Sequence, residues 1–179
     1  IGANHELLKR HEALPPVSLQ LLLRAAHALG PAARAAIPGV AARFDAPNMD
    51  LHFVAAVLAR LGPDSIPILH KTLAHTNPAV RAECAWALGE FKDAAEEAVP
   101  DLVKLLDDAA FDDTARRYVI TSLVQIGTHA EIVVPPILKL LESDPRWKKM
   151  GAIQALGSFG TDAATSLPNL LNLLTDKDP

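Results

Sequence analysis

The sequence predicts an all-α protein in which pairs of helices stack into a superhelix. Half of the 179 residues are apolar and only 4% are aromatic, which favours close-packed helices because a sheet would need alternating β-branched and aromatic residues. A large aliphatic residue followed by Gly occurs five times, and an aliphatic residue followed by Pro comes after each. The five prolines are 29, 33, 35 and 33 residues apart, a period that indicates a helical solenoid. The paired markers are Leu29-Gly30 with Ile37-Pro38, Leu61-Gly62 with Ile66-Pro67, Leu88-Gly89 with Val99-Pro100, Ile126-Gly127 with Val134-Pro135, and Leu156-Gly157 with Leu167-Pro168.

The clearest unit runs from residue 77 to residue 110. Asn77 suits an N-cap, and Pro78 suits the first helical position, where a missing N–H costs nothing. Apolar residues then recur every three or four positions in one stripe, and Gly89 is expected to close this helix as its C′ residue. A second helix with the same spacing carries Pro100 in its first turn. Neither helix can bury its stripe alone, so the two must pack on each other and on the next copy.

We expect about five such helix pairs in a single repeat array that covers residues 1–179. Residues 1–15 are expected to be the second helix of a preceding repeat, and Asp176-Lys177-Asp178-Pro179 resembles the start of a new first helix. Solenoids need polar capping repeats at their ends, and the sequence has none, so further repeats are expected on both sides. The predicted repeats are approximately 16–45, 47–76, 77–110, 111–143 and 144–176.

The first helices share a register counted back from the Gly. The residue four positions before it is apolar in every repeat, and the residue five positions before it is mostly small, which lets a neighbouring helix approach closely. These positions are expected to form the core. The residues four before the Gly are Ala26, Leu58, Ala85, Leu123 and Ile153, and those five before it are Ala25, Val57, Cys84, Ser122 and Ala152.

The charge balance argues against a nucleic-acid or membrane partner. The formal net charge is −4: residues 1–90 hold eight Lys/Arg and seven Asp/Glu (+1), whereas residues 91–179 hold nine and fourteen (−5). An acidic surface gives no bulk attraction to phosphates. The sequence has no apolar run near the roughly 20 residues that a membrane helix needs. The single cysteine excludes an internal disulfide, so cysteine usage does not indicate the redox compartment of the protein.

The unit AVRAECAWALGEFKDAAEEAVPDLVKLLDD resembles a HEAT repeat of the short bacterial type that also occurs in phycobilin lyases. The resemblance covers nearly the whole chain and is sharpest in the third and fifth repeats. It implies a right-handed superhelix with first helices on the convex side and second helices lining a concave groove, and it implies protein binding without catalysis. The Arg that usually follows Val in the first helix occurs only as Arg81. The equivalent positions hold Leu22, Val54, Val119 and Lys149.

Two His-Glu pairs near the amino terminus are candidates for a metal site. A zinc protease needs HExxH, in which two His on one helix face bind the metal, but in His5-Glu6-Leu7-Leu8-Lys9 a lysine stands where the second His should be. Deoxyhypusine hydroxylase, a HEAT-repeat di-iron enzyme, carries His-Glu pairs six and seven residues before the Gly, and no such position here holds one. The second pair, His11-Glu12, also lies outside that register. We therefore expect no metal, no cofactor and no catalytic residue.

Cysteine and the remaining histidines do not combine into a catalytic pattern. Cys84 falls in the small-residue core row, where burial is expected rather than the exposure that a reactive thiol needs. His70 and His75 are five residues apart and so do not share a helix face as an i, i+4 ligand pair would.

A row of lysines on the second helices is the main candidate binding site. Lys71, Lys104 and Lys139 each come four residues after a marker proline. On adjacent second helices they would form a ladder with steps of about 10 Å, which could bind an acidic segment of a partner. The alternative is that they form surface pairs with acids three residues on, Lys104 with Asp107 and Lys139 with Glu142.

Two tryptophans are further candidates for a partner surface, because Trp is enriched at binding hot spots. Trp86 lies three residues before its Gly and is more simply explained by packing between repeats. Trp147 lies near the start of the last first helix, beside Arg146, Lys148 and Lys149, and both explanations stay open.

The sequence thus predicts a non-catalytic protein-binding or scaffolding domain that binds a partner along its concave face. The alternative is an enzyme or accessory factor with a HEAT-like fold: a ligand binder resembling the phycobilin lyases or, with less support from the charge, a protein resembling the helical-repeat DNA glycosylases.

Overall fold

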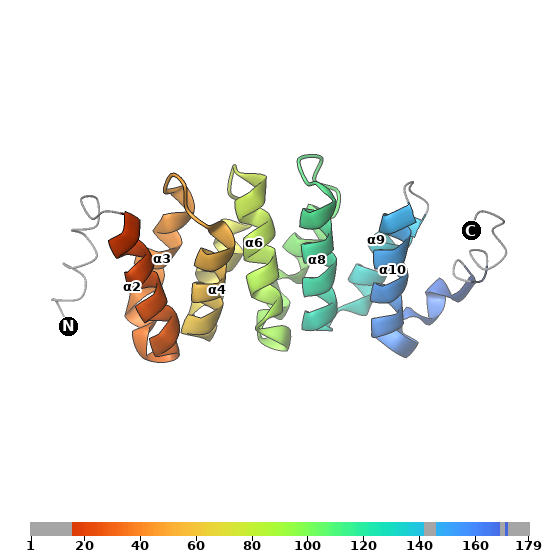
Figure 1. Ribbon diagram of the computed structural model, residues 1–179. Coiled ribbons are helices and arrows are strands. Elements are labelled where there is room, and N and C mark those ends of the chain that lie inside the picture. The colour runs from red at the N-terminus through yellow and green to blue at the C-terminus, as the bar shows by residue number, and fades with distance from the viewer. Residues whose placement is uncertain (1–15, 142–145, 169–170, 172–179) are drawn as a thin grey trace.

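In the computed structural model, all regular structure in the described residues (16–141, 146–168 and 171) is helical. The prediction of an all-α superhelix is confirmed. The first helices stand side by side in one layer, and the second helices form a layer behind them (Figure 1). The first helices are α2 (Pro16–Leu29), α4 (Leu51–Leu61), α6 (Pro78–Gly89), α8 (Asp113–Ile126) and α10 (Arg146–Phe159), and the second helices are α3 (Ile37–Ala41), α5 (Ile66–Thr72), α7 (Val99–Leu105) and α9 (Ala130–Leu141).

Three first helices begin at side-chain caps. The carboxylate of Asp50 accepts from the Phe53 N–H at 3.0 Å, and that of Asp112 accepts from the Ala115 N–H at 2.8 Å. The side chain of Asn77 accepts from the Ala79 N–H at 3.0 Å, as its predicted role as an N-cap requires. Each cap satisfies an N–H group that has no partner within its helix, which fixes where α4, α6 and α8 start.

Three of the connections within repeats share one conformation. In the first, third and fifth repeats a seven-residue 3-10 segment follows the first helix: Gly30–Ala36, Lys92–Ala98 and Gly160–Ser166. Each contains one non-helical alanine with nearly the same backbone angles, and these are Ala33 (φ −98°, ψ 19°), Ala95 (φ −101°, ψ 17°) and Ala163 (φ −96°, ψ 16°). The second repeat turns instead through Pro63–Ser65. The first, third and fifth repeats therefore join their first and second helices through the same turn.

The core lies between the two layers and continues from one repeat to the next. Val57, Cys84, Ser122 and Ala152 are buried, as the small-residue register predicts, but Ala25 in the first described helix is exposed. The residues four positions before the Gly are buried in four repeats, whereas the fifth, Ile153, is 41% exposed. The largest fully buried side chains include Leu58, Leu69, Leu88, Leu102, Leu123 and Ile137, which come from both layers of the second, third and fourth repeats.

The expected role of Gly89 as a C′ residue is wrong. Gly89 is the last residue of α6, and the helix is capped by Glu90 in an ordinary right-handed conformation. A Cβ placed on Gly89 would lie 2.8 Å from Cα of Ser122, so this glycine permits the close approach of α8. Gly157 is likewise inside α10. Gly127, by contrast, is a left-handed C-cap at φ 70°, which glycine adopts without steric cost.

Some predicted features lie outside the described residues. These are the extra helix at residues 1–15 with its two His-Glu pairs, and the start of another repeat at Asp176–Pro179. None of the helices within the described ranges has the length and apolar character needed to cross a membrane.

Candidate functional site

The three lysines of the predicted ladder lie on successive second helices. Lys71 is on α5, Lys104 on α7 and Lys139 on α9, and all three side chains are exposed. The marker prolines occupy the first turns of α5 and α7. Lys71 and Lys104 therefore occupy equivalent positions in these two helices. We call these three residues the lysine row. Within the described chain, the side chain of Lys71 has no hydrogen bond or ion pair.

The ion pairs of the row differ from those that the surface-pair alternative predicts. Lys104 Nζ lies 2.7 Å from Oδ1 of Asp101, one turn before it, and not beside Asp107. Asp107 instead reaches across to the next repeat, where its Oδ1 lies 3.2 Å from Lys139 Nζ. The predicted partner of Lys139, Glu142, lies outside the described residues.

Asp101 joins two neighbouring second helices. Its Oδ2 lies 2.9 Å from Nε2 of His70 on α5, while its Oδ1 accepts from Lys104. These hydrogen bonds, first that of Lys104 and then that of His70, lower the pKa of the Asp101 carboxyl below its ordinary value. The second-helix face therefore carries alternating positive and negative groups along its length.

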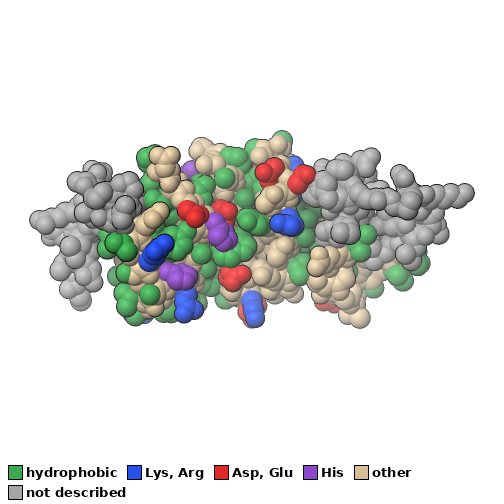
Figure 2. Space-filling model, in the orientation of Figure 1, with side chains coloured by type: hydrophobic (Ala, Val, Ile, Leu, Met, Phe, Trp, Pro, Cys, Tyr) green, Lys and Arg blue, Asp and Glu red, His purple; other side chains and the backbone are tan. Residues whose placement is uncertain are grey.

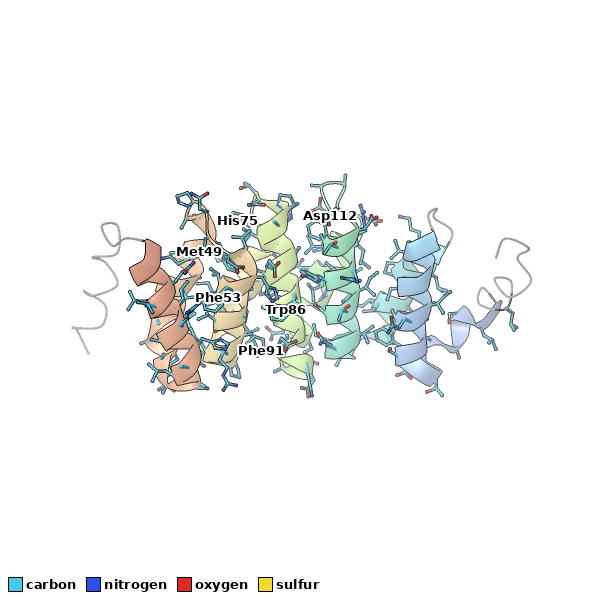
Figure 3. The ribbon with its side chains drawn as sticks, viewed as in Figure 1. Met49, Phe53, His75, Trp86, Phe91 and Asp112 are labelled. Atoms are coloured by element: carbon cyan, nitrogen blue, oxygen red, sulfur yellow. The ribbon has the colours of Figure 1, made fainter. Side chains whose placement is uncertain are left out.

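Trp86 lies between the second and third repeats and remains partly exposed. Its ring centroid is 4.5 Å from that of His52 on α4, with the rings tilted by 47°. His52 also places Nδ1 2.9 Å from Oε2 of Glu83, one turn before Trp86. Figure 3 shows Trp86 in the carboxyl-terminal half of α6 and Asp112 at the start of α8. Trp147 is the second residue of α10, and its side chain is not among those described.

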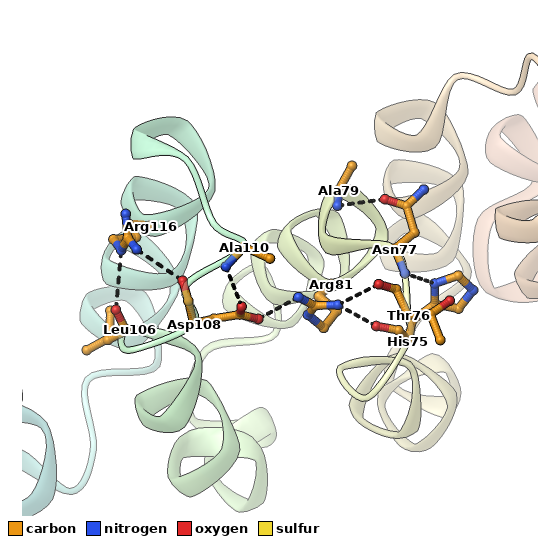
Figure 4. Close-up of polar contacts among 9 residues, drawn as sticks. All are labelled: His75, Thr76, Asn77, Ala79, Arg81, Leu106, Asp108, Ala110 and Arg116. Carbon is orange, nitrogen blue, oxygen red and sulfur yellow. Dashed lines mark hydrogen bonds and ion pairs between the residues drawn. The ribbon is translucent and has the colours of Figure 1, made fainter.

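Arg81 carries the densest polar network in this part of the molecule (Figure 4). Its Nη1 donates to the carbonyl oxygens of His75 at 2.6 Å and Thr76 at 3.0 Å, and its Nη2 lies 2.5 Å from Oδ2 of Asp108. The guanidinium also lies over the Phe111 ring, 5.4 Å from its centroid. These bonds tie the turn before α6 to the turn before α8, so their role is to hold successive repeats together.

Asp108 is the other centre of this network. Its Oδ1 accepts from the Ala110 N–H at 2.9 Å, and its carbonyl oxygen accepts from Arg116 at 3.0 Å. The backbone hydrogen bond of Ala110, followed by the hydrogen bond and charge of Arg81, holds the pKa of the Asp108 carboxyl below its ordinary value. The sequence pointed to Arg81 as a family residue, but nothing in its spacing identified Asp108 as the partner.

A hollow of about 240 Å³ lies between α6 and α8, two neighbouring first helices. Its floor is formed by the small side chains of Ala82 and Ala115, and its charged lining residues are Glu83 and Asp112. The remaining lining residues are Pro78, Ala79, Ala110, Thr114 and Tyr118. Figure 2, which faces the first helices, shows acidic, basic and histidine side chains scattered among hydrophobic ones across α4, α6 and α8. Sequence reasoning missed this hollow because its two walls belong to different repeats.

Cys84 is fully buried, as predicted, and burial raises the pKa of its thiol, with a smaller contribution from the charge of Glu83. His70 and His75 bind separate carboxylates, Asp101 and Asp45. Among the described residues, no group of three or more His, Cys, Asp or Glu side chains is placed to hold a metal ion.

The layered helix pairs define an α-helical repeat protein, and comparison with known proteins specifies the repeat. Residues 40–123 match the family described as HEAT repeats. An engineered protein of known structure is similar over 99% of this chain and 91% of its own, with 19% identity and a TM-score of 0.61. The complex of CpcE and CpcF of phycocyanin lyase from Nostoc sp. PCC7120 is similar over 97% of this chain and 71% of its own, with 24% identity and a TM-score of 0.61. At these sequence identities, both similarities show the fold alone. The comparison with curated proteins found no match.

Proposed function

We propose that this chain is a non-catalytic protein-binding scaffold, and that the second-helix face binds an acidic segment of its partner. The observation that carries the proposal is the lysine row, which presents one exposed cation on each of α5, α7 and α9. Packed helices lie about 8–10 Å apart, so an extended acidic segment that crosses the helices would meet a cation at each step.

The existing ion pairs of the row do not prevent such binding. The side chains of Lys104 and Asp101 are 75% and 46% exposed, and those of Lys139 and Asp107 are 69% and 70% exposed. Exposed pairs of this kind contribute about 0–1 kcal/mol, so partner carboxylates can replace the aspartates at little cost. A partner with hydrogen-bond donors could at the same time bind the released Asp101 and Asp107. Affinity would then come from several weak contacts on a rigid frame.

The test compares two charge-reversed variants against a fluorescent acidic peptide rich in Glu. One variant is K71E/K104E/K139E, and its control is R24E/R60E/R117E, which reverses three exposed cations of the first helices. Both variants have the same net charge, so any difference between them reports location. Fluorescence anisotropy should show that the first variant weakens binding at least about tenfold, or 1.4 kcal/mol, and that the control weakens it much less. Equal losses in the two variants would rule out the lysine row.

The ligand-binding alternative is separated by a different measurement. A bilin-binding protein should change the visible absorbance of a free bilin on mixing, because a buried chromophore changes its conformation and surroundings. Under our proposal the spectrum of the mixture equals the sum of its components.

A further inference from the structure

We propose that the hollow between α6 and α8 binds an arginine side chain of a partner protein. It lies on the layer of the first helices, away from the lysine row on the second helices, and takes a group of opposite charge. This surface would give the scaffold a second point of attachment, and it does not depend on whether the lysine row binds.

The size of the hollow fits one side chain. Its volume of about 240 Å³ lies below the roughly 300–1,000 Å³ of sites for drug-sized ligands. The floor residues Ala82 and Ala115 are buried and present only methyl groups, so nothing obstructs entry. The half-buried Tyr118 supplies an aromatic wall, against which a planar guanidinium can stack.

The charge of the lining selects a cation. Both charged lining residues, Glu83 and Asp112, are acidic. Glu83 uses Oε2 to bind His52, and Asp112 uses Oδ1 to cap α8. The second oxygen of each carboxylate has no hydrogen-bond partner within the described chain. Two such acceptors suit the several N–H donors of an arginine better than the single ammonium of a lysine.

The main opposing effect is the positive end of the helix dipoles. Both α6 and α8 begin beside the hollow, and each amino end contributes about half a positive charge. Together they amount to about one unit, whereas the two carboxylates contribute two. The nearby guanidinium of Arg116 is directed elsewhere, because it donates to the carbonyl oxygens of Leu106 and Asp108. By this count the two carboxylates exceed the charge of the helix ends by about one unit.

The probe is the tripeptide acetyl-Gly-Arg-Gly-amide, compared with the same peptide carrying citrulline, which has nearly the shape of arginine but no charge. Titration near neutral pH is followed by amide chemical shifts in the ¹⁵N-labelled protein. The arginine peptide should shift the amide signals of Ala79, Ala82, Thr114 and Ala115 in a saturable manner, and the citrulline peptide should leave them unchanged. Equal shifts with both peptides, or none with either, would overturn the proposal.

Variants connect those shifts to the two carboxylates. The double variant E83Q/D112N removes both charges but keeps an oxygen near His52 and a good N-cap on α8, and its affinity for the arginine peptide should fall about tenfold. The control E90Q/D113N removes one exposed charge from the C-cap of α6 and one from the first turn of α8, and it should bind as the wild type does. Ala79→Phe fills the hollow from its exposed rim without changing the charge, and it should abolish the shifts. Undiminished binding by either E83Q/D112N or Ala79→Phe places the peptide elsewhere.

Discussion

Arg81 and Asp108, 27 residues apart, form an ion pair with 2.5 Å between Nη2 and Oδ2 at the junction of two repeats. Their side chains are only 12% and 20% exposed, so solvent screens the pair less than the lysine pairs of the other layer. Arg81 also donates to two carbonyl oxygens of the preceding turn. One side chain thus fixes the starts of both α6 and α8, which form the walls of the hollow.

Removing Arg81 should destabilise the protein strongly. Arg81→Met keeps most of the apolar stem but leaves the Asp108 carboxylate and two backbone carbonyls without this donor. The buried Nε of Arg81 has no hydrogen-bond partner among the described residues, which reduces the contribution of the native side chain. We expect a loss of about 2–4 kcal/mol in the free energy of unfolding, measured by urea denaturation. The control Arg117→Met changes an exposed side chain of α8 and should cost under about 0.5 kcal/mol.

The coupling of the two residues can be measured in a double-mutant cycle. Arg81→Met and Asp108→Asn together should cost less than the sum of the single variants, with an interaction energy of about 1–2 kcal/mol. Strict additivity would show that the pair contributes little and that Arg81 acts through its backbone contacts.

The free energy of unfolding should fall more steeply in acid for the wild type than for a variant that lacks the Asp108 carboxylate. The folded protein lowers the pKa of the Asp108 carboxyl, so the unfolded chain binds a proton first. The stabilisation is complete above the ordinary aspartate value of about 3.9 and is lost as the pH falls through the lower folded-state value. Urea midpoints measured from neutral pH into this acid range should therefore decline less in Asp108→Asn than in the wild type.

Asp101 offers an internal comparison for the acid experiment. Its pKa is also lowered, but its side chain is 46% exposed against 20% for Asp108, and solvent screens its pairs. Asp101→Asn should change the acid slope less than Asp108→Asn. The reverse order would mean that the second-helix face, rather than the Arg81 network, governs acid stability.

Gly89→Ala should destabilise the folded protein, whereas Gly157→Ala should not. A Cβ on Gly89 would meet Cα of Ser122 at 2.8 Å and Oε1 of Gln125 at 2.4 Å. The glutamine can move but the backbone of α8 cannot move without shifting the repeat, so we expect a cost of about 1–3 kcal/mol. No atom of the described residues lies within 4 Å of a Cβ on Gly157, and alanine there should stabilise the helix by about 0.5–1 kcal/mol. Thermal melts of the two variants, moving in opposite directions, provide the check.

The sequence predicted the helices and much of the core because both depend on local periodicity. The Asn77 cap and the buried register of Val57 and Cys84 follow from spacing within one repeat. Gly89 was misinterpreted because the same letter serves two purposes: a left-handed turn, as in Gly127, and close packing of helices. The two purposes are distinguished only by how closely α8 packs against α6 at this position.

Contacts between repeats were beyond sequence reasoning. Lys104 pairs with Asp101 rather than with Asp107 because Asp107 faces Lys139 of the next repeat. The hollow has the same origin, since Glu83 and Asp112 are 29 residues apart and come together only when α8 packs on α6. A periodic pattern predicts which face of a helix is buried, but not which side chains meet across two repeats.

Both proposed surfaces depend on a regular step from each repeat to the next, and one distance measurement tests it. Spin labels at residues 71 and 139, in a protein with Cys84→Ala, would report two successive steps between second helices. Pulsed electron spin resonance should give a single narrow distribution near about 20 Å, twice the usual packing distance. A broad distribution, or one centred far from this value, would contradict a stacked array. The lysine row would then lack the regular spacing that the proposed binding requires.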